Sequence, residues 1–252
     1  MDKKKIIAIS ILPFMWFLYF IFELITGRVE SNLYIVFNIL ICFVFSIVSY
    51  IIYKVCLNHI NGFSKKTLLT IFFILFILDQ GSKIIIKLFF FKKSFYMLDN
   101  FLSFNPIINT KGSWLNARFG TSVSFSLLII LNVLALILFF ESYRYYKSLG
   151  FKDSWSDLCV VFIMAGCICS LIDKIFYGGS LDFIGISDLF IADLKDIYIN
   201  LAIFLFILTI YLNDFLKDDK NSTLKDDFKS LIYFFRFIIS DISKFLKNNF
   251  YR

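Results

Sequence analysis

The segment from Phe162 to Leu208 reads FIMAGCICSLIDKIFYGGSLDFIGISDLFIADLKDIYINLAIFLFIL. It opens and closes on apolar runs typical of membrane helices. Five aspartates lie between these runs or at their edges: Asp173, Asp182, Asp188, Asp193 and Asp196. A carboxylate that faces hydrocarbon is costly unless it finds a partner or a proton. The segment therefore predicts a helical hairpin in the membrane with carboxylates at its mouth.

The composition of the whole chain also indicates a membrane protein. Of the 252 residues, 59% are hydrophobic and 20% are aromatic, whereas soluble domains average about 45–50% apolar. The net charge of +7 fits cytoplasmic loops, which collect Lys and Arg, better than a nucleic-acid partner. An odd number of cysteines in or beside apolar runs argues against a disulfide framework, and the single His59 cannot build a zinc site alone.

Six apolar segments are candidates to cross about 30 Å of hydrocarbon. We expect the spans at Ile6–Thr26, Leu33–Tyr53, Thr67–Asp79, Ser122–Phe140, Leu158–Lys174 and Asp196–Leu212. The third is short, so we expect it to begin near Ser64, an acceptable N-cap, and to run past Asp79 toward Ile86. We interpret the first as a retained span, because its apolar run is long for a signal peptide and no small-x-small cleavage site follows.

Basic residues predict the direction of the spans, because cytoplasmic loops are rich in Lys and Arg. Such residues precede the first span and lie in the second and fourth connections: Lys3, Lys4, Lys5, Lys54, Lys65, Lys66, Arg144, Lys147 and Lys152. We therefore expect both termini in the cytoplasm. The apolar residues of the tail, residues 216–252, recur at helical spacing with Lys, Arg and Asp on much of the other face. This pattern predicts a basic amphipathic helix on the inner leaflet, with a partner-binding helix as the alternative.

The hairpin places two aspartates at the same depth. The fifth span runs outward and ends at Asp173, and the sixth begins near Asp196 and runs inward. Two close carboxylates cannot both ionise freely, so one proton is shared and a water between them can be activated, as in aspartic proteases. Ordinary interfacial charges are the alternative interpretation of each aspartate.

Four ordered blocks extend this interpretation. They are LDQGSK from Leu78 to Lys83, NTKGSW from Asn109 to Trp114, GCICSLIDKIFYGGSLDFI from Gly166 to Ile184, and DLKDIYIN from Asp193 to Asn200. Read together, over residues 66–214, they resemble signal peptidase II, the bacterial lipoprotein signal peptidase. Any single block is weak, but four in this order with matching span spacing are specific.

The resemblance implies that Asp173 and Asp196 are the catalytic aspartates. Asp193 competes for the second position, because FIAD also resembles the end of the family motif Asn-x-Ala-Asp. The chain departs from the family at four nearby positions: Ser170 stands for Asn, Cys169 for Gly, Lys174 for Arg and Lys195 for Ala. These departures put the substrate range in doubt more than the aspartates.

The resemblance also implies supporting residues. It gives Asp79 and Lys83, four residues apart on one helical face, a role near the active site, and a plain helix-end ion pair is the alternative. Asn109 would hold the substrate or orient an aspartate, and a turn residue is the alternative. Asp182 would hydrogen-bond the outer loop. The remaining positions that match or replace motif residues are Gly112, Ser170 and Lys174.

The predicted fold is an all-α integral membrane protein: a four-helix catalytic core at 61–215, two additional spans at 1–60, and the tail at 216–252. The family adds a small extracytoplasmic sheet, to which the β-like segment Tyr96–Ile108 is suited, and a surface helix after it. The resemblance implies an aspartic endopeptidase of the bacterial plasma membrane that needs no metal or organic cofactor, with an active site near the outer surface. Its partners would be prolipoproteins and membrane lipids, and the extra spans or the tail would suit a membrane partner. A degenerate scaffold protein and a transporter are the alternative functions.

Overall fold

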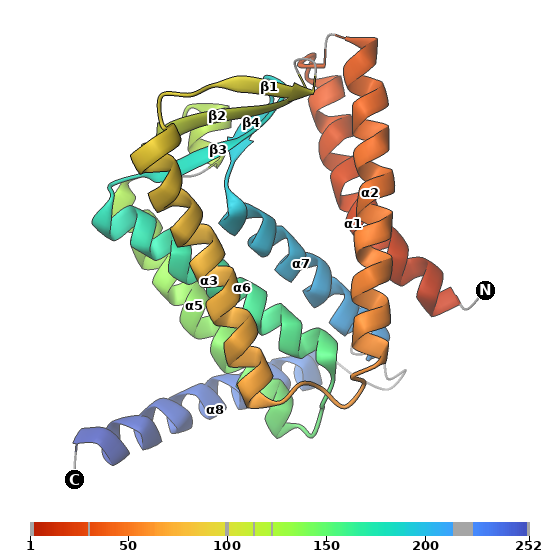
Figure 1. Cartoon of the computed structure of the whole chain (residues 1–252). Coiled ribbons are helices and arrows are strands. Elements are labelled where there is room, and N and C mark those ends of the chain that lie inside the picture. The colour runs from red at the N-terminus through yellow and green to blue at the C-terminus, as the bar shows by residue number, and fades with distance from the viewer. Residues whose placement is uncertain are drawn as a thin grey trace.

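Six long apolar helices make up most of the molecule (Figure 1). The computed structural model describes residues 3–29, 31–98, 101–112, 114–121, 123–213 and 224–250. The six helices are α1 (Lys3–Ile25), α2 (Asn32–Leu57), α3 (Lys65–Ile85), α5 (Phe125–Ser148), α6 (Ser154–Phe176) and α7 (Leu194–Leu212). Each is long and apolar enough to cross a membrane, which confirms the predicted fold class.

Helix α3 begins and extends as predicted. The hydroxyl of Ser64 accepts a hydrogen bond from the Thr67 N–H at 3.1 Å, so Ser64 is the N-cap. The helix runs past Asp79 and continues into η1, a π-helical turn at Ile86–Phe90. Because of this length, Asp79 and Lys83 lie in the last turns of α3 rather than in a loop.

Helix α6 is the centre of the bundle. Buried residues make up 56% of its most apolar stretch, the largest share among the six described spans, and α3, α5 and α7 all pack against it. The largest buried apolar cluster joins α6 and α7 to the N-terminal helix pair; it consists of Ala8, Leu12, Tyr53, Cys56, Trp155, Leu158, Phe204, Leu205 and Leu208. This shared core makes α1 and α2 part of the same body as the other spans.

A small antiparallel sheet covers one end of the bundle (Figure 1). Its strands are β1 (Phe95–Leu98), β2 (Leu102–Asn109), β3 (Ser180–Ile186) and β4 (Phe190–Ala192), in the order β1-β2-β3-β4. The register between β2 and β3 shifts between Phe104 and Ile107, around Pro106, which has no N–H for the ladder. Because β3 follows α6 and β4 precedes α7, the sheet ties together the two helix ends that carry the predicted aspartates.

The α1–α2 pair is fastened to this sheet by ion pairs and hydrogen bonds. The buried Glu23 carboxylate binds the guanidinium groups of Arg28 and Arg118, each at 3.3 Å. Arg28 also donates to the carbonyl oxygens of Asp188 and Leu189, in the β3–β4 turn. Arg118 belongs to α4 (Trp114–Phe119), a short helix that follows β2 where a surface helix is predicted.

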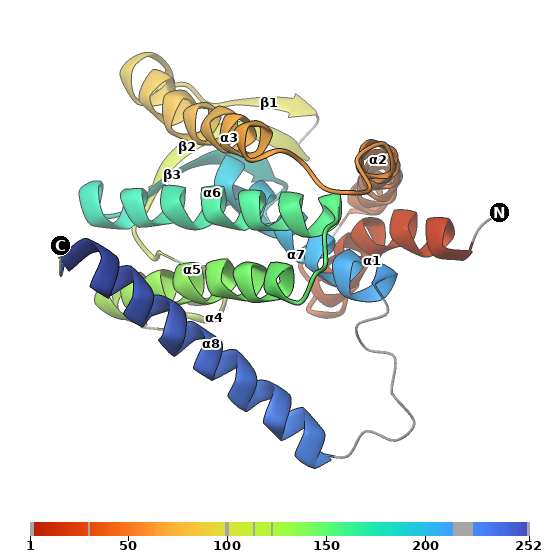
Figure 2. The ribbon, with the colours of Figure 1, turned by 90° about the horizontal axis from the view of Figure 1, so that it is seen from below.

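Helix α8 (Leu224–Phe250) crosses the opposite end of the bundle (Figures 1 and 2). The guanidinium of Arg144 in α5 binds both carboxylate oxygens of Asp241, and the Tyr145 ring contacts Phe234 and Phe237. Part of the predicted tail, residues 216–223 and 251–252, lies outside the described residues. The tail is helical over its described part, and its position on the inner leaflet remains a prediction.

Candidate active site

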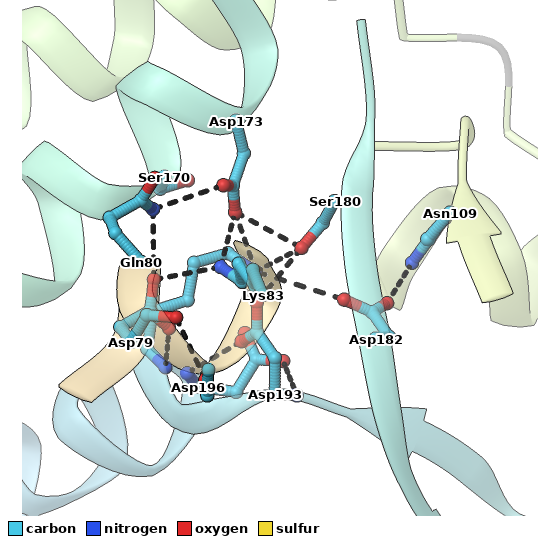
Figure 3. Close-up of polar contacts among 12 residues, drawn as sticks. Asp79, Gln80, Lys83, Asn109, Ser170, Asp173, Ser180, Asp182, Asp193 and Asp196 are labelled. Carbon is cyan, nitrogen blue, oxygen red and sulfur yellow. Dashed lines mark hydrogen bonds and ion pairs between the residues drawn. The ribbon is translucent and has the colours of Figure 1, made fainter. Parts of the chain in front are cut away.

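The ends of three helices meet at the end of the bundle that the sheet covers (Figure 1), and their side chains gather in one cluster (Figure 3). The last turns of α3 bring Asp79, Gln80 and Lys83, the last turn of α6 brings Asp173, and the N-cap of α7 is Asp193. All five residues are buried. The structure therefore assembles charged side chains from distant parts of the chain at the same end of the bundle.

A tight turn after α6 carries β3 back over Asp173. Gly178 has a φ of +62°, which favours glycine, and the Gly179 N–H donates to the Asp173 carbonyl oxygen at 3.3 Å. A Cβ at position 179 would lie 2.9 Å from the carbonyl oxygen of Asn109. Only glycine at this position therefore lets the chain pass so close to β2. This turn places the Ser180 hydroxyl next to the Asp173 carboxylate.

The ammonium of Lys83 lies between three carboxylates. Its Nζ is 2.8 Å from Asp79 Oδ2, 2.7 Å from Asp173 Oδ2 and 2.7 Å from Asp193 Oδ2. Each of its three N–H donors thus has an acceptor. The predicted Asp79–Lys83 contact is present, and Lys83 additionally joins α3 to both α6 and α7.

Asp193 rather than Asp196 faces Asp173. The hydroxyl Oγ of Ser180 is 3.1 Å from Asp173 Oδ2 and 2.9 Å from Asp193 Oδ2. Asp196 Oδ2 instead accepts from the Asp193 N–H at 3.2 Å, while Asp193 Oδ1 accepts from the Asp196 N–H at 3.3 Å, which forms a capping box. Among the interactions of the described residues, Asp196 has none with Asp173.

Lys195 turns back from the first turn of α7 into the same cluster. Its Nζ is 2.5 Å from Asp193 Oδ2, 2.6 Å from Ser180 Oγ and 3.4 Å from Asp173 Oδ2. Its backbone N–H donates to Asp79 Oδ1 at 3.0 Å. Lys195 therefore links the start of α7 to α3 through its backbone and to both facing carboxylates through its side chain.

Asp182 and Asn109 form a pair across β2 and β3. The Nδ2 of Asn109 donates to Asp182 Oδ2 at 2.8 Å, and Asn109 Oδ1 accepts from the Lys111 N–H at 3.1 Å. Asn109 thus orients an aspartate and also makes a turn contact, the two alternatives considered for it. Asp182 Oδ1 lies 3.8 Å from Lys195 Nζ, which places Asp182 at the edge of the charged cluster.

The other predicted site residues lie farther from the facing carboxylates. Gly112 has a φ of +72°, and a Cβ there would lie 2.9 Å from a methyl group of Leu128, so it permits close packing against α5. Ser170 and Lys174 pair with each other, with Lys174 Nζ donating to Ser170 Oγ at 2.5 Å. Neither the Ser170 nor the Lys174 side chain has a direct contact with Asp173 among the contacts of the described residues.

The charges around Asp193 determine its protonation. Burial raises the pKa of its carboxyl, but the ammonium groups of Lys195 and Lys83 outweigh burial and lower the pKa to about 2. The pKa of Asp182 is raised, because burial outweighs the opposing effect of Lys195. The site therefore holds the Asp193 carboxylate in its ionised form more firmly than the Asp182 carboxylate.

Three carboxylates come close enough together to suggest a cation site. Among the described residues, one oxygen each of Asp182, Asp193 and Asp196 lie within 4.8 Å of one another. The Lys195 ammonium lies beside two of them, and it supplies positive charge at the place where a metal ion would bind. These three carboxylates therefore give no support to a metal site.

Three residues of the site had no predicted role. Gln80 donates from Nε2 to Asp79 Oδ2 at 3.0 Å and to Asp173 Oδ1 at 3.3 Å; Ser180 and Lys195 make the contacts given above. Lys195 carries a signal that can be seen in the sequence, because a lysine in the first turn of a helix opposes the helix dipole. Gln80 and Ser180 carry no such signal.

Comparison with known proteins identifies the family. The model of the family described as Signal peptidase (SPase) II matches residues 71–212, more than half of the chain. A solved bacterial membrane enzyme, determined by the in meso method at 2.3 Å resolution, has a TM-score of 0.51 and 20% identity, covering 65% of this chain and 98% of its own. A second such structure, at 1.9 Å, has a TM-score of 0.49 and 21% identity, covering 60% of this chain and 96% of its own. No curated protein matches the chain significantly.

The likeness to the first solved structure shows the shared fold, and the family model shows membership. Its match begins after α2 and ends with α7, so α1, α2 and α8 lie outside the matched residues. With six apolar spans and a family match over more than half its length, this multi-pass membrane protein belongs to the signal peptidase II family of proteases.

Proposed function

We propose that this chain is an intramembrane aspartic endopeptidase that removes signal peptides from diacylglyceryl-modified prolipoproteins, with Asp173 and Asp193 as its catalytic pair. The observation that carries the proposal is the shared hydroxyl of Ser180, which lies within 3.1 Å of one carboxylate and 2.9 Å of the other. Asp193 takes the place that the family resemblance implied for Asp196, because Asp193 Oδ2 shares the Ser180 hydroxyl with Asp173, whereas Asp196 Oδ2 accepts from the Asp193 backbone N–H.

The pair performs the reaction by moving protons. One carboxylate takes a proton from a water molecule while the resulting hydroxide forms a bond to the scissile carbonyl carbon. The other, protonated, carboxyl gives its proton to the carbonyl oxygen. The tetrahedral intermediate then collapses: the first carboxyl returns its proton to the leaving amide nitrogen and the C–N bond breaks. As the new C=O bond forms, a hydroxyl of the intermediate returns a proton to the second carboxylate, which restores the pair.

Lys83 and Asp79 support this chemistry from α3. The Lys83 ammonium binds Asp173 and Asp193 at equal distances of 2.7 Å, so it fixes their spacing and stabilises negative charge between them. A water molecule held by both carboxylates has to share their oxygens with the Lys83 ammonium. Asp79 holds Lys83 by its third hydrogen bond and anchors the Lys195 backbone.

The position of the site suits a substrate that is itself in the membrane. Asp173 lies in the last turn of α6, just before β3, and Asp193 is the N-cap of α7, just after β4. The sheet covers this end of the spans (Figure 1), which is the outer side if both termini are cytoplasmic. A lipid-modified cysteine and the signal helix before it lie at this depth, so the scissile bond can reach the site from within the bilayer. We assign residues 61–215 to this catalytic core, and residues 1–60 and the tail to additions around it.

The test compares three isosteric variants in a bacterial host that lacks its own lipoprotein signal peptidase. We expect Asp173→Asn and Asp193→Asn each to reduce prolipoprotein processing on the order of 10³-fold or more, because the amide can neither accept a proton from water nor donate one as an acid. Asp196→Asn is the matched control and should retain most processing. Full processing by Asp173→Asn or Asp193→Asn would refute the assignment of these two residues as the catalytic pair. Loss of processing with Asp196→Asn alone would support Asp196 as the second catalytic aspartate, as the family resemblance implied.

A further inference from the structure

Lys195 is a buried lysine at a helix start, where its charge is unfavourable. Only 5% of the residue is exposed, and the N-terminal end of a helix repels positive charge. Its position in the cluster therefore requires strong compensation from the carboxylates.

The compensation comes from every element around it. The carboxylates of the cluster are Asp79 on α3, Asp173 on α6, Asp182 on β3, and Asp193 and Asp196 at the start of α7; the cations besides Lys195 are Lys83 on α3 and Lys174 on α6. Lys195 is not placed evenly among these carboxylates. Its Nζ is 2.5 Å from Asp193 Oδ2 and 3.4 Å from Asp173 Oδ2.

The helix ends add to this asymmetry. Asp193 is the N-cap of α7, where the helix dipole stabilises a negative charge, whereas Asp173 lies in the last turn of α6, where the dipole opposes one. Lys83 does not distinguish the two, because it is 2.7 Å from each. Two independent features, Lys195 and the helix ends, thus favour charge on Asp193.

Hydrogen-bond counting at Ser180 agrees with this distribution. The hydroxyl has one hydrogen but lies within bonding distance of two carboxylates, and it also accepts from Lys195. If Asp173 carries a proton, it can donate that proton to Ser180 Oγ, and Ser180 donates its own hydrogen to the ionised Asp193. Every group then has a partner of the right kind.

We propose that Lys195 is a positioning residue that keeps Asp193 ionised, so that Asp193 is the base that activates water and Asp173 carries the proton given to the carbonyl oxygen. This inference rests on the proposed function. It also sets aside a serine–lysine mechanism with Ser180 as nucleophile, because the base of such a pair must be a neutral amine, and the carboxylates around Lys195 keep it charged.

The experiment measures kcat/KM against pH for the purified full-length chain in lipid nanodiscs, with a diacylglyceryl-modified prolipoprotein peptide as substrate. An adjacent positive charge lowers a carboxyl pKa by ~1–3 units. Removal of the charge in Lys195→Met or Lys195→Gln should therefore shift the acid limb of the profile to higher pH by ~1–3 units. Lys195→Arg should keep the limb in place, and Lys152→Met, which removes an exposed lysine far from the site, should leave the whole profile unchanged.

The outcomes separate this inference from the proposed function. If the wild-type chain does not cleave the peptide, the proposed function fails. If it does, and Lys195→Met and Lys195→Gln lower the rate equally at all pH values without moving the acid limb, Lys195 has only a structural role and the inference is overturned. The inference is also overturned if both neutral variants fail to fold, or if Ser180→Ala abolishes a covalent acyl-enzyme intermediate.

Discussion

Close packing between α6 and α7 at Gly166 determines how the two aspartates meet. A Cβ at this position would lie 2.7 Å from Cγ1 of Ile199 and 3.4 Å from the carbonyl oxygen of Lys195. The first distance is shorter than real Cβ contacts allow. Gly166→Ala therefore forces α7 to move, and the first turn of α7 carries Asp193.

The magnitude follows from two opposing terms. Alanine is favoured over glycine in a helix by about 1 kcal/mol, and overpacking a core costs about 1–3 kcal/mol. Ile199 cannot relieve the contact easily, because a β-branched side chain in a helix has one strongly preferred rotamer. We expect Gly166→Ala to change the free energy of unfolding by about 0 to −2 kcal/mol.

Gly81 in α3 offers a matched control near the same site. A Cβ there meets only a methyl group of Ile77, at 4.0 Å, so Gly81→Ala should gain about 1 kcal/mol from helix propensity alone. The two variants make the same chemical change and differ in the space available. Thermal unfolding in detergent should separate them by several degrees.

The effect on cleavage should exceed the effect on stability. A displacement of about 1 Å between catalytic groups can cost ~10²-fold in rate, and the strain at Gly166 lies between the helix that carries Asp173 and the helix start that carries Asp193. We expect kcat to fall ~10–100-fold in Gly166→Ala and to change little in Gly81→Ala. Equal activity of the two variants would refute the claim that this contact positions the aspartates.

Three further predictions concern charge. Burial raises the pKa of Asp193, but nearby ammonium groups lower it to about 2. The ionised form of Asp193 therefore stabilises the fold above about pH 4, and this contribution is lost as the pH falls toward 2. The difference in unfolding temperature between wild type and Asp193→Asn should shrink over that range and stay constant from about pH 5 to 8. Glu23→Gln should cost about 1.5–3 kcal/mol, because Arg118 loses a charged acceptor, and unfolding in detergent measures the loss; no change would mean that this ion pair does not fasten α1. Asp241→Asn removes the carboxylate bound by Arg144, so hydrogen exchange across α8 should rise while cleavage is unchanged, and unaltered exchange would contradict a role in docking α8.

Much of the fold follows from local patterns. Apolar runs predict all six spans because the bilayer demands about 20 such residues for each, and Ser64 is a recognisable helix start because only a few side chains can cap a free N–H. The β-like segment before Asn109 also forms the strand it predicts. These features depend on residues a few positions apart.

The attachment of the additional helices depends on contacts that no local pattern contains. Glu23 meets Arg118 across 95 positions of sequence, and the sequence shows only a carboxylate near the end of a span and a basic residue in an outer segment. Either residue alone suits an interfacial charge. Arg28, which also binds Glu23, is held by the Leu189 carbonyl oxygen in the β3–β4 turn, so this group of contacts is brought together by the tertiary structure.

The choice between Asp193 and Asp196 shows the same limit within the site itself. The stretch Asp193-Leu194-Lys195-Asp196 permits a helix to start at either aspartate, because both residue types serve as caps and both lie next to an apolar run. Family spacing favoured Asp196, since the apolar helix then follows it directly. What decides the matter in space is the hydrogen bond from the Lys195 N–H to Asp79 on α3, which holds the first turn of α7 in an orientation where the N-cap points to Asp173. A contact that spans 116 positions thus selects which aspartate faces Asp173, and this selection depends on a backbone donor that any residue except proline would supply. The sequence can therefore narrow the partner of Asp173 to two candidates, Asp193 and Asp196. Only the packing of α3 against α7 distinguishes these two.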